Sequence, residues 1–475
     1  MFSVATWTLI ILVHVCGVIA AMRAIMDVRT AQGAIAWAVA LIAFPYLSLP
    51  AYLIFGRRKF HGYVSRRRGE LLKTSAVAQR FVAQLIERRL LAEPGRDHAL
   101  LIERLAKSPF TVGNDVELLI DGEATFQSIF AGIDKAEEYI LVEFYILRDD
   151  RIGRELQRRL IGKARAGVRV AVLFDEIGSK RLSTRFQREL RDAGAEIFPF
   201  NTSRGRSNRW QLNFRNHRKI VIVDGKTAWV GGMNVGDEYL GRDPKFRPWR
   251  DTQVKVTGPI VPAIQLAFYE DWHWATQNFL PLRWEAEPAA SGRECAALCL
   301  ASGPSDRLET CTLFFLDLIN RATKRLWIAS PYFVPDEQFI SALQLAALRN
   351  VDVRVLIPRK TDDFLVGLSN WCCAGELTSN GVKVFQYRNG FMHQKVVLAD
   401  DRYATVGTAN FDNRSFRLNF EITVAVSDDA FAGEVRQMLE VDFARSRQIE
   451  EGELARRGFW FRFGTRVARL LSPVQ

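Results

Sequence analysis

Two stretches of the chain carry a histidine and a lysine at the same spacing, each followed at the same distance by an aspartate. Both read H-x-K-x-x-x-x-D, with His217, Lys219 and Asp224 in the first copy and His393, Lys395 and Asp400 in the second. A further matched element follows each after the same gap, Gly231-Gly232-Met233-Asn234 and then Gly407-Thr408-Ala409-Asn410. A single H-x-K fits an ordinary strand-end histidine, but two copies with matched tails indicate a duplicated functional site.

The residues after each histidine predict a hairpin that gathers these side chains. Ile220 to Val223 is apolar and β-branched, Asp224-Gly225 is a hairpin dipeptide, and Thr227 to Val230 resumes strand character. Because side chains alternate along a strand, the histidine and the lysine project from one face, and the return strand brings the asparagine back to that edge. The second copy has the same pattern.

An imidazole, an ammonium and an amide from each of two half-sites suit a phosphodiester. One histidine can attack phosphorus while the other protonates the leaving oxygen, and lysine and asparagine donors can hold the phosphate oxygens. This chemistry needs no metal, and we expect no cofactor. The predicted catalytic set is His217, Lys219, Asp224, His393, Lys395 and Asp400, in which the two aspartates brace the site at the hairpin turns, and Asn234 and Asn410 are predicted to bind phosphate.

The chain resembles the phospholipase D superfamily, and within it the bacterial cardiolipin synthases that have an N-terminal transmembrane hairpin. The stretches that carry the resemblance span nearly the whole chain: Phe214 to Lys219, Asn234 to Tyr239, Trp249-Arg250-Asp251, Ser330 to Asp336, Gly390 to His393 and Arg414 to Glu421. The resemblance implies a phosphohistidine intermediate and transfer of a phosphatidyl group to an alcohol. We therefore expect a synthase that joins two phosphatidylglycerols into cardiolipin and releases glycerol.

Residue roles follow from the same resemblance. It implies that His217 is the nucleophile and His393 the acid and base, although the two roles could be reversed. It also implies that an acid downstream of each motif hydrogen-bonds a catalytic histidine, and the matching positions are Asp251 and Glu421. Their task would be to fix the tautomer and stabilise the imidazolium. The alternative is that both acids form surface ion pairs with Arg250 or Arg417.

Other functions stay open at this stage. A hydrolase would give the intermediate to water, and a related transferase would use another alcohol or phosphatidylethanolamine. A phosphodiesterase acting on nucleic acid fits the formal charge of +12, but an anionic bilayer fits it equally. We expect phosphatidylglycerol and an anionic membrane as partners and no nucleic acid, because of the N-terminal segment. A membrane scaffold with a dead site is the weakest alternative, since both motifs are intact.

The N-terminal segment predicts a membrane protein. Residues 1–56 contain two apolar stretches, Phe2 to Ala21 and Ala31 to Phe55, each long enough to cross a bilayer as one arm of a hairpin, with Pro45 and Pro50 kinking the second. The basic residues that follow are Arg57-Arg58-Lys59, Arg66-Arg67-Arg68 and Lys73. By the positive-inside rule, the catalytic part faces the cytoplasm of a bacterial inner membrane. Residues 57–108 are predicted to form a basic helical connector.

The remainder divides into two similar α/β halves and a tail. Alternating strands and helices predict two α/β domains, 109–290 and 291–454, with mixed, largely parallel sheets packed around one shared active site. The resemblance implies that both are phospholipase D-like domains. In residues 455–475, apolar residues from Phe459 to Leu471 gather on one helical face and Arg462, Arg466 and Arg469 on another. This helix either lies in the membrane interface or closes the second domain. The six cysteines have no paired zinc spacing.

Overall fold

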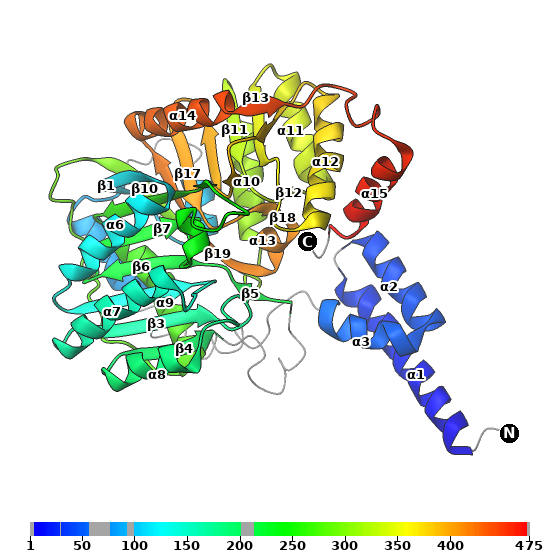
Figure 1. The fold of residues 1–475 in the computed structure, drawn as a ribbon, viewed down its shortest axis with the longest axis horizontal. Coiled ribbons are helices and arrows are strands. Elements are labelled where there is room, and N and C mark those ends of the chain that lie inside the picture. The colour runs from blue at the N-terminus through cyan, green and yellow to red at the C-terminus, as the bar shows by residue number, and fades with distance from the viewer. Residues whose placement is uncertain (1–3, 29, 57–76, 93–98, 201–212, 473–475) are drawn as a thin grey trace.

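The computed structural model describes residues 4–28, 30–56, 77–92, 99–200 and 213–472. A mixed sheet of sixteen strands passes through both halves of the chain, in the order β20-β14-β13-β11-β16-β17-β19-β10-β1-β9-β7-β6-β2-β3-β4, with β5 paired to β19. The halves join where β1 pairs antiparallel with β10. Helices cover the sheet, and the N-terminal helices α1, α2 and α3 lie apart from it (Figure 1).

The two halves repeat one order of elements. The first half contains β1 (Thr111–Ile120), α6 (Asp121–Asp134), β2 (Tyr139–Phe144), α7 (Arg151–Arg165), β3 (Arg169–Asp175), α8 (Thr184–Asp192), β4 (Glu196–Phe200), β5 (Arg215–Asn216), β6 (Lys219–Val223), β7 (Thr227–Gly231), η1 (Asp237–Leu240), β8 (Trp249–Arg250), β9 (Thr252–Thr257) and α9 (Val261–Thr276). The second contains β10 (Cys295–Ser302), α10 (Thr310–Arg321), β11 (Arg325–Ala329), β12 (Phe333–Val334), α11 (Glu337–Leu348), β13 (Asp352–Pro358), α12 (Phe364–Thr378), β14 (Lys383–Tyr387), β15 (Phe391–Met392), β16 (Val396–Ala399), β17 (Tyr403–Gly407), β18 (Phe411–Asp412), α13 (Asn413–Arg417), β19 (Asn419–Ser427), α14 (Asp429–Ala444) and β20 (Ser446–Gln448). The predicted alternation of strands and helices is therefore confirmed.

The prediction of largely parallel sheets is wrong. Among the described strands of the main sheet's outer parts, parallel pairing joins β2, β3 and β4 in one half and β11, β13 and β14 in the other. The motif hairpins and the strands beyond them pair antiparallel. The physical reason is that a short hairpin turn joins only antiparallel strands, so each hairpin reverses the direction set by the β-α-β units.

One hydrophobic core runs beneath both halves. Phe268 and Trp272 of α9 and Leu439 of α14 belong to the same buried cluster, which also contains strand residues from each half, such as Val254 and Val424. Separate clusters fill the space under α6, α7 and α8 and under α10, α11 and α12. Because α9 and α14 share a core, the two predicted domains are packed as one body around the central strands.

The N-terminal segment holds one long apolar helix and two short ones. α1 (Val4–Asp27) is long and apolar enough to cross a membrane, whereas α2 (Ala31–Ala43) and α3 (Pro45–Phe55) are shorter. The second predicted span is therefore not one continuous helix. It breaks at Phe44 because Pro45 has no N–H to donate and disfavours helical geometry in the residue before it. A side chain at Gly17 of α1 would collide with the Leu41 carbonyl, so α1 and α2 pack closely there.

The described parts of the predicted connector are helical and pack on the catalytic halves. Residues 77–87 form a helix that buries Phe81 and Leu85 near Ala286, and α5 (Ala99–Ala106) buries Ile102 and Leu105 against the second half. The basic residues Arg57-Arg58-Lys59, Arg66-Arg67-Arg68 and Lys73 lie outside the described residues. At the other end of the chain, α15 (Phe459–Leu470) packs against α12.

Candidate active site

The two motifs meet because a short strand beside each motif pairs with a strand of the other half. β5, just before His217, pairs in parallel with the beginning of β19, and β8 pairs in parallel with β15, just before His393. The backbone N–H of His217 donates to the Phe420 carbonyl at 2.9 Å, and that of His393 donates to the Arg250 carbonyl at 2.8 Å. Each histidine therefore lies beside the segment of the opposite half that carries the acid.

The acids pair with the histidines across the two halves. Nδ1 of His217 lies 2.9 Å from a carboxylate oxygen of Glu421, and Nδ1 of His393 lies 2.7 Å from Asp251. Both acids are fully buried, so neither forms a surface ion pair. With Nδ1 held by the carboxylate, Nε2 of His217 is left to face a reacting atom, whereas Nε2 of His393 lies 3.1 Å from Nζ of Lys395.

The two acids are held differently, and sequence reasoning missed the residues that hold them. Glu421 accepts hydrogen bonds from the Thr408 hydroxyl at 2.5 Å and from the Asn419 amide at 3.1 Å. Asp251 accepts from the backbone N–H of Thr252 at 2.8 Å. A Cβ on Gly232, the counterpart of Thr408, would lie 2.0 Å from the Asp251 carboxylate. The difference between Gly232 and Thr408 was the visible signal of this asymmetry.

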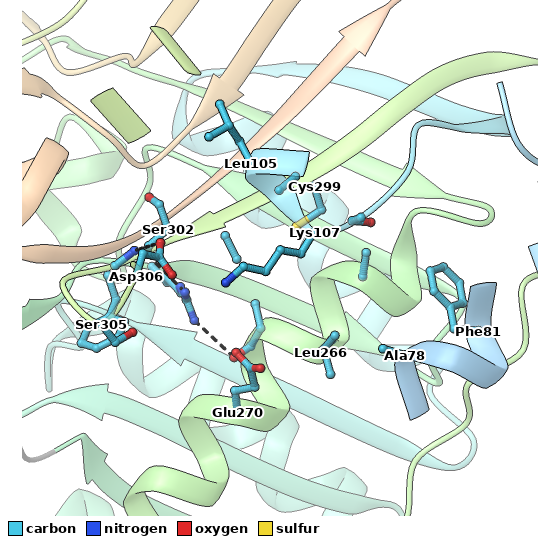
Figure 2. A pocket seen from close by; sticks show the side chains of 18 of the residues that line it. Ala78, Phe81, Leu105, Lys107, Leu266, Glu270, Cys299, Ser302, Ser305 and Asp306 are labelled. Carbon is cyan, nitrogen blue, oxygen red and sulfur yellow. Dashed lines mark hydrogen bonds between the residues drawn. The ribbon is translucent and has the colours of Figure 1, made fainter. Parts of the chain in front are cut away.

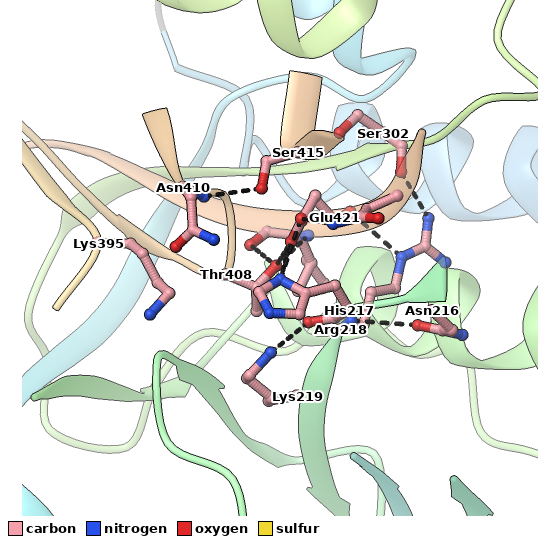
Figure 3. A network of polar contacts seen from close by, with 12 residues as sticks. Asn216, His217, Arg218, Lys219, Ser302, Lys395, Thr408, Asn410, Ser415 and Glu421 are labelled. Carbon is pink, nitrogen blue, oxygen red and sulfur yellow. Dashed lines mark hydrogen bonds and ion pairs between the residues drawn. The ribbon is translucent and has the colours of Figure 1, made fainter. Parts of the chain in front are cut away.

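The motif lysines are buried beside the histidines, and their charge is destabilised. Nζ of Lys219 donates to the His217 carbonyl at 2.6 Å, and Nζ of Lys395 donates to the His393 carbonyl at 2.5 Å (Figure 3 for Lys219). Burial lowers the pKa of Lys219 to about 7 and that of Lys395 to about 8, although Glu421 and Asp251 act in the opposite direction. An entering phosphate would therefore meet ammonium groups that lack solvation.

The histidines are neutral at neutral pH. Burial lowers the pKa of His217 to about 4, against the attraction of Glu421, and the nearby charges of Lys219 and Lys395 act in the same direction as burial. Burial and Lys395 also lower the pKa of His393. Burial alone would raise the pKa values of Asp251 and Glu421, but the facing histidines and lysines overcome it and lower both. The site thus combines neutral imidazoles with ionised carboxylates.

The two motif asparagines are in different states. The Asn234 carbonyl oxygen accepts from the Ile146 N–H at 3.0 Å, and its amide donates to the Tyr239 hydroxyl at 3.0 Å. The buried Asn410 carbonyl oxygen has no hydrogen-bond partner within the described ranges. Figure 3 places Asn410 and Lys395 in the same group of side chains as His217. Asn410 therefore has more capacity left for a ligand than Asn234.

The motif aspartates stand at the far ends of the motif strands and contact backbone groups. Asp224 accepts from the N–H groups of Glu137, Glu138 and Tyr139 at 2.7 to 2.9 Å. Asp400 accepts from the corresponding turn before β11, including the N–H groups of Thr323 and Lys324. These contacts tie each aspartate to a backbone turn, and they put neither carboxylate on a motif histidine.

Aromatic rings surround both histidines, which sequence reasoning also missed. The Tyr145 ring packs edge-on against His217 with centroids 5.0 Å apart, and Trp249 lies 5.1 Å from His393. Phe391 also stacks on His393 at 5.9 Å. These rings restrict the movement of each imidazole and keep its surroundings poor in water. Over the residues that the structure describes, no three His, Cys, Asp or Glu side chains are grouped as metal ligands are.

Comparisons with known proteins give matches over nearly the whole chain. The chain matches the family described as "Cardiolipin synthase, PLD-like domain" over residues 129–244 and 315–443, and "Phospholipase_D-nuclease N-terminal" over residues 7–57. It is 49% identical to "Cardiolipin synthase A" of Pseudomonas entomophila (strain L48), covering 98% of each chain. It is 48% identical to the protein of the same name from Pseudomonas putida (strain W619), covering 98% of this chain and 97% of that one.

Solved structures share the fold at low sequence identity. The crystal structure of a phosphatidylserine synthase from Haemophilus influenzae Rd KW20 matches with a TM-score of 0.61 and 17% identity, covering 79% of this chain and 100% of that one. A polyphosphate kinase from Porphyromonas gingivalis matches with a TM-score of 0.50 and 12% identity, covering 77% of this chain and 52% of that one. At these identities the likeness concerns the fold alone.

Proposed function

Because the chain belongs to the cardiolipin synthase family of the phospholipase D superfamily, we propose that it transfers a phosphatidyl group between two phosphatidylglycerols. The products would be cardiolipin and glycerol. The observation that carries this proposal is the pair of crossed histidine–acid contacts, which present two neutral, oriented imidazoles to one phosphodiester. Two such groups suit a double displacement at phosphorus.

The first displacement forms a covalent intermediate. Nε2 of His217 attacks the donor phosphorus, the bond from phosphorus to the glycerol oxygen breaks, and protonated His393 gives its proton to that oxygen. The negative phosphate raises the pKa of His393 from its lowered value in the free site, so that the ring can carry this proton. Lys219, Lys395 and Asn410 are proposed to hold the phosphate oxygens as charge builds on them.

The second displacement reverses the first. The glycerol hydroxyl of the acceptor phosphatidylglycerol loses its proton to neutral His393, its oxygen attacks phosphorus, and the bond from phosphorus to His217 breaks. Asp251 and Glu421 stabilise whichever imidazolium is present at each stage. Asn234 is proposed to act mainly by fixing Ile146 and Tyr239 near the phosphate, since these contacts already use its amide.

The test is the identity of the lipid product. Purified protein would be incubated with phosphatidylglycerol in mixed micelles, without added nucleotide, and the lipids analysed by mass spectrometry. Cardiolipin and glycerol in equal amounts, lost in His217→Ala, would support the transferase. Phosphatidic acid as the sole product would show that water accepts the intermediate, and the proposal would then be replaced by a hydrolase.

We also propose that the enzyme is a multi-pass protein of the bacterial inner membrane, with its catalytic halves in the cytoplasm. The support is the apolar α1, the match of residues 7–57, and the basic residues after residue 56 in the sequence. The α2 and α3 helices would complete the membrane segment as a broken arm, with small residues of α1 such as Ala20 and Ala24 packed against it.

We infer that α15 lies in the membrane interface. Thr465 and Ala468 face α12 and are buried, whereas Trp460 is 79% exposed, and Phe459 and Leu470 are also exposed. The exposed apolar side chains share the helix with Arg462 and Arg466. An exposed aromatic face bordered by arginines fits the boundary of an anionic bilayer.

A further inference from the structure

Two buried arginines occupy corresponding places under the two histidine–acid pairs, although they stand at different positions of the repeat. Arg218 follows His217 in the first motif, whereas its counterpart in the second motif is Gln394. Arg250 precedes Asp251, whereas its counterpart before Glu421 is Phe420. Each histidine–acid pair therefore has one arginine beside it, supplied once from the histidine side and once from the acid side.

Three contacts of the Arg218 guanidinium have counterparts at Arg250. Arg218 donates to the backbone carbonyl of Glu421 at 3.2 Å, to Asp271 of α9 at 2.6 Å, and to the Ser302 carbonyl at 3.3 Å. Figure 3 shows Arg218 reaching toward Ser302 and Glu421. Its guanidinium thus joins the acid-bearing strand to a helix and to the strand opposite.

Arg250 makes the equivalent contacts in the other pair. It donates to the backbone carbonyl of Asp251 at 2.7 Å, to Asp442 of α14 at 2.8 Å, and to the carboxylate of Asp121 at 3.2 Å. Asp442 corresponds to Asp271, because α14 and α9 are the closing helices of the two halves. Asp121 takes the place of Ser302. Ser302 ends β10 and pairs with Glu421, and Asp121 directly follows the end of β1 and donates its N–H to the Asp251 carbonyl, although it accepts from the arginine through its carboxylate and Ser302 does so through its backbone carbonyl.

We infer that Arg218 and Arg250 are equivalent positioning residues, each fixing the acid strand that orients one catalytic histidine. Neither guanidinium is placed to touch the substrate, because both are 4% exposed at most and bind carbonyls and carboxylates of the protein. A forked donor that binds a strand carbonyl and a helix carboxylate at once restrains the strand along two directions. A displacement of the acid by a fraction of an ångström would misalign Nε2 of the histidine.

The residues at the exchanged positions support the equivalence. Gln394 donates to Asp442 at 2.9 Å. In the second motif, the position that matches Arg218 is therefore occupied by a neutral amide, and the arginine that binds Asp442 is Arg250. The Phe420 ring lies 5.6 Å from the Arg218 guanidinium and packs against Phe200. Each pair thus keeps one arginine and one uncharged neighbour, which avoids burying two guanidinium groups against one aspartate.

A cavity beside Arg218 makes a direct test possible. Its volume is about 90 Å³, and its lining includes Arg218, Phe420, Ser302, Leu266 and Lys107. Figure 2 shows Lys107 and Ser302 around this space, on the side of the connector helices. Truncating Arg218 would enlarge this cavity, so a small planar cation can take the place of the lost guanidinium.

The experiment measures cardiolipin synthesis by Arg218→Ala in the full-length protein. We expect kcat to fall by about 100-fold with little change in the KM for phosphatidylglycerol, since the acid is displaced but the phosphate donors remain. Guanidinium chloride at millimolar concentration should raise the kcat of Arg218→Ala at least about tenfold. Urea, which has the same planar shape without the charge, and sodium chloride at equal ionic strength are the matched controls and should restore nothing.

A second variant covers the outcome in which Arg218→Ala fails to fold because Asp271 loses its partner. The pair Arg218→Gln with Asp271→Asn removes both charges together, and its folded fraction would be checked by thermal unfolding. Reduced kcat in folded protein would support the inference. Wild-type kcat in either folded variant, or equal effects of urea and guanidinium, would overturn it. The inference rests on the proposed function, and failure of the wild-type protein to make cardiolipin would refute that function instead.

Discussion

At the scale of single residues, the two motif histidines have the same side chain but are held by different residues. Glu421 holds His217 with help from Thr408 and Asn419, whereas Asp251 holds His393 beside Trp249. The proposed division of labour makes His217 the nucleophile and His393 the acid. A substrate whose leaving group needs no proton separates these roles.

The first prediction concerns that separation. With a phosphatidyl ester of p-nitrophenol as donor, His393→Ala and Asp251→Asn should still release nitrophenol at a rate within about tenfold of wild type. His217→Ala and Glu421→Gln should release it about 1,000-fold more slowly, because the nucleophile is absent or wrongly oriented. Stopped-flow absorbance measures the release. The reverse pattern would assign the nucleophile to His393.

The second prediction concerns pH. The pKa of His217 is lowered to about 4, so the neutral nucleophile is lost as pH falls through that value. The pKa values of Lys219 and Lys395 are lowered to about 7 and about 8, so the cationic phosphate donors are lost as pH rises through that range. His393 must also carry a proton in the first displacement, and its pKa is lowered too, so loss of that proton adds to the alkaline limb. A plot of kcat/KM against pH, which reports the free enzyme, should therefore be bell-shaped.

The Glu421→Gln variant tests whether His217 causes the acid limb of this profile. Glu421 raises the pKa of His217, so Glu421→Gln should move the acid limb to lower pH in addition to reducing the rate. The alkaline limb should persist, because both lysines remain. Activity that continues to rise above pH 9 would contradict the assignment of cationic lysines to phosphate binding.

At the scale of elements, the motif hairpins are the part of the fold that local sequence predicts best. Their signals are short-range: an apolar run, a turn dipeptide and a second apolar run. Asp224 and Asp400 have positive φ values of 53° and 57°, which aspartate adopts more readily than most residues. The direction of the neighbouring strands was predicted wrongly, because it depends on partners distant in sequence.

The third prediction tests the bracing role of the turn. Asp224→Ala leaves the N–H groups of Glu137, Glu138 and Tyr139 without their acceptor and should cost about 1–3 kcal/mol of unfolding free energy. Asp224→Asn keeps one acceptor oxygen and the tolerance of positive φ, so it should cost less. Thermal unfolding in detergent measures both, and kcat per folded molecule should stay at the wild-type value. Loss of kcat in folded Asp224→Asn would indicate a direct catalytic role.

The fourth prediction concerns α15. A photoreactive benzoylphenylalanine at position 460 should crosslink to phosphatidylglycerol in nanodiscs, because Trp460 is exposed on the apolar face. The matched control is position 461, where Phe461 contacts Trp371 of α12 and should crosslink within the protein. Mass spectrometry of the adducts reads out both positions. Absence of a lipid adduct at position 460 would favour α15 as a helix that only closes the second half.

At the scale of the whole molecule, the site depends on contacts between the halves, because the histidine of each half is held by an acid of the other. The sequence predicts that Asp251 and Glu421 serve histidines, but it contains no local signal for which acid serves which histidine. That assignment depends on the parallel pairings of β5 with β19 and of β8 with β15. The packing of the connector likewise depends on contacts between distant segments. The break at Phe44, by contrast, has a local signal, since Pro45 is one of the two prolines predicted to kink the second apolar stretch.

The fifth prediction follows from these contacts between the halves. Because one chain supplies both histidines and both acids of the site, co-expressed His217→Ala and His393→Ala chains should make no more cardiolipin than either alone. Isolated membranes assayed with phosphatidylglycerol provide the measurement, and the double variant in one chain is the control. Recovery of activity would mean that the halves of two chains exchange to rebuild a complete site.

The contacts of His217 with Glu421 and of His393 with Asp251 also affect how the two halves of this duplicated protein can evolve. In most duplications, one copy can decay while the other keeps working. Here, a substitution of the acid in either half removes the partner of the histidine in the other half. Selection for activity therefore acts on both halves. The two halves are therefore constrained together. Their sequences can diverge only through changes that keep both histidine–acid contacts between the halves.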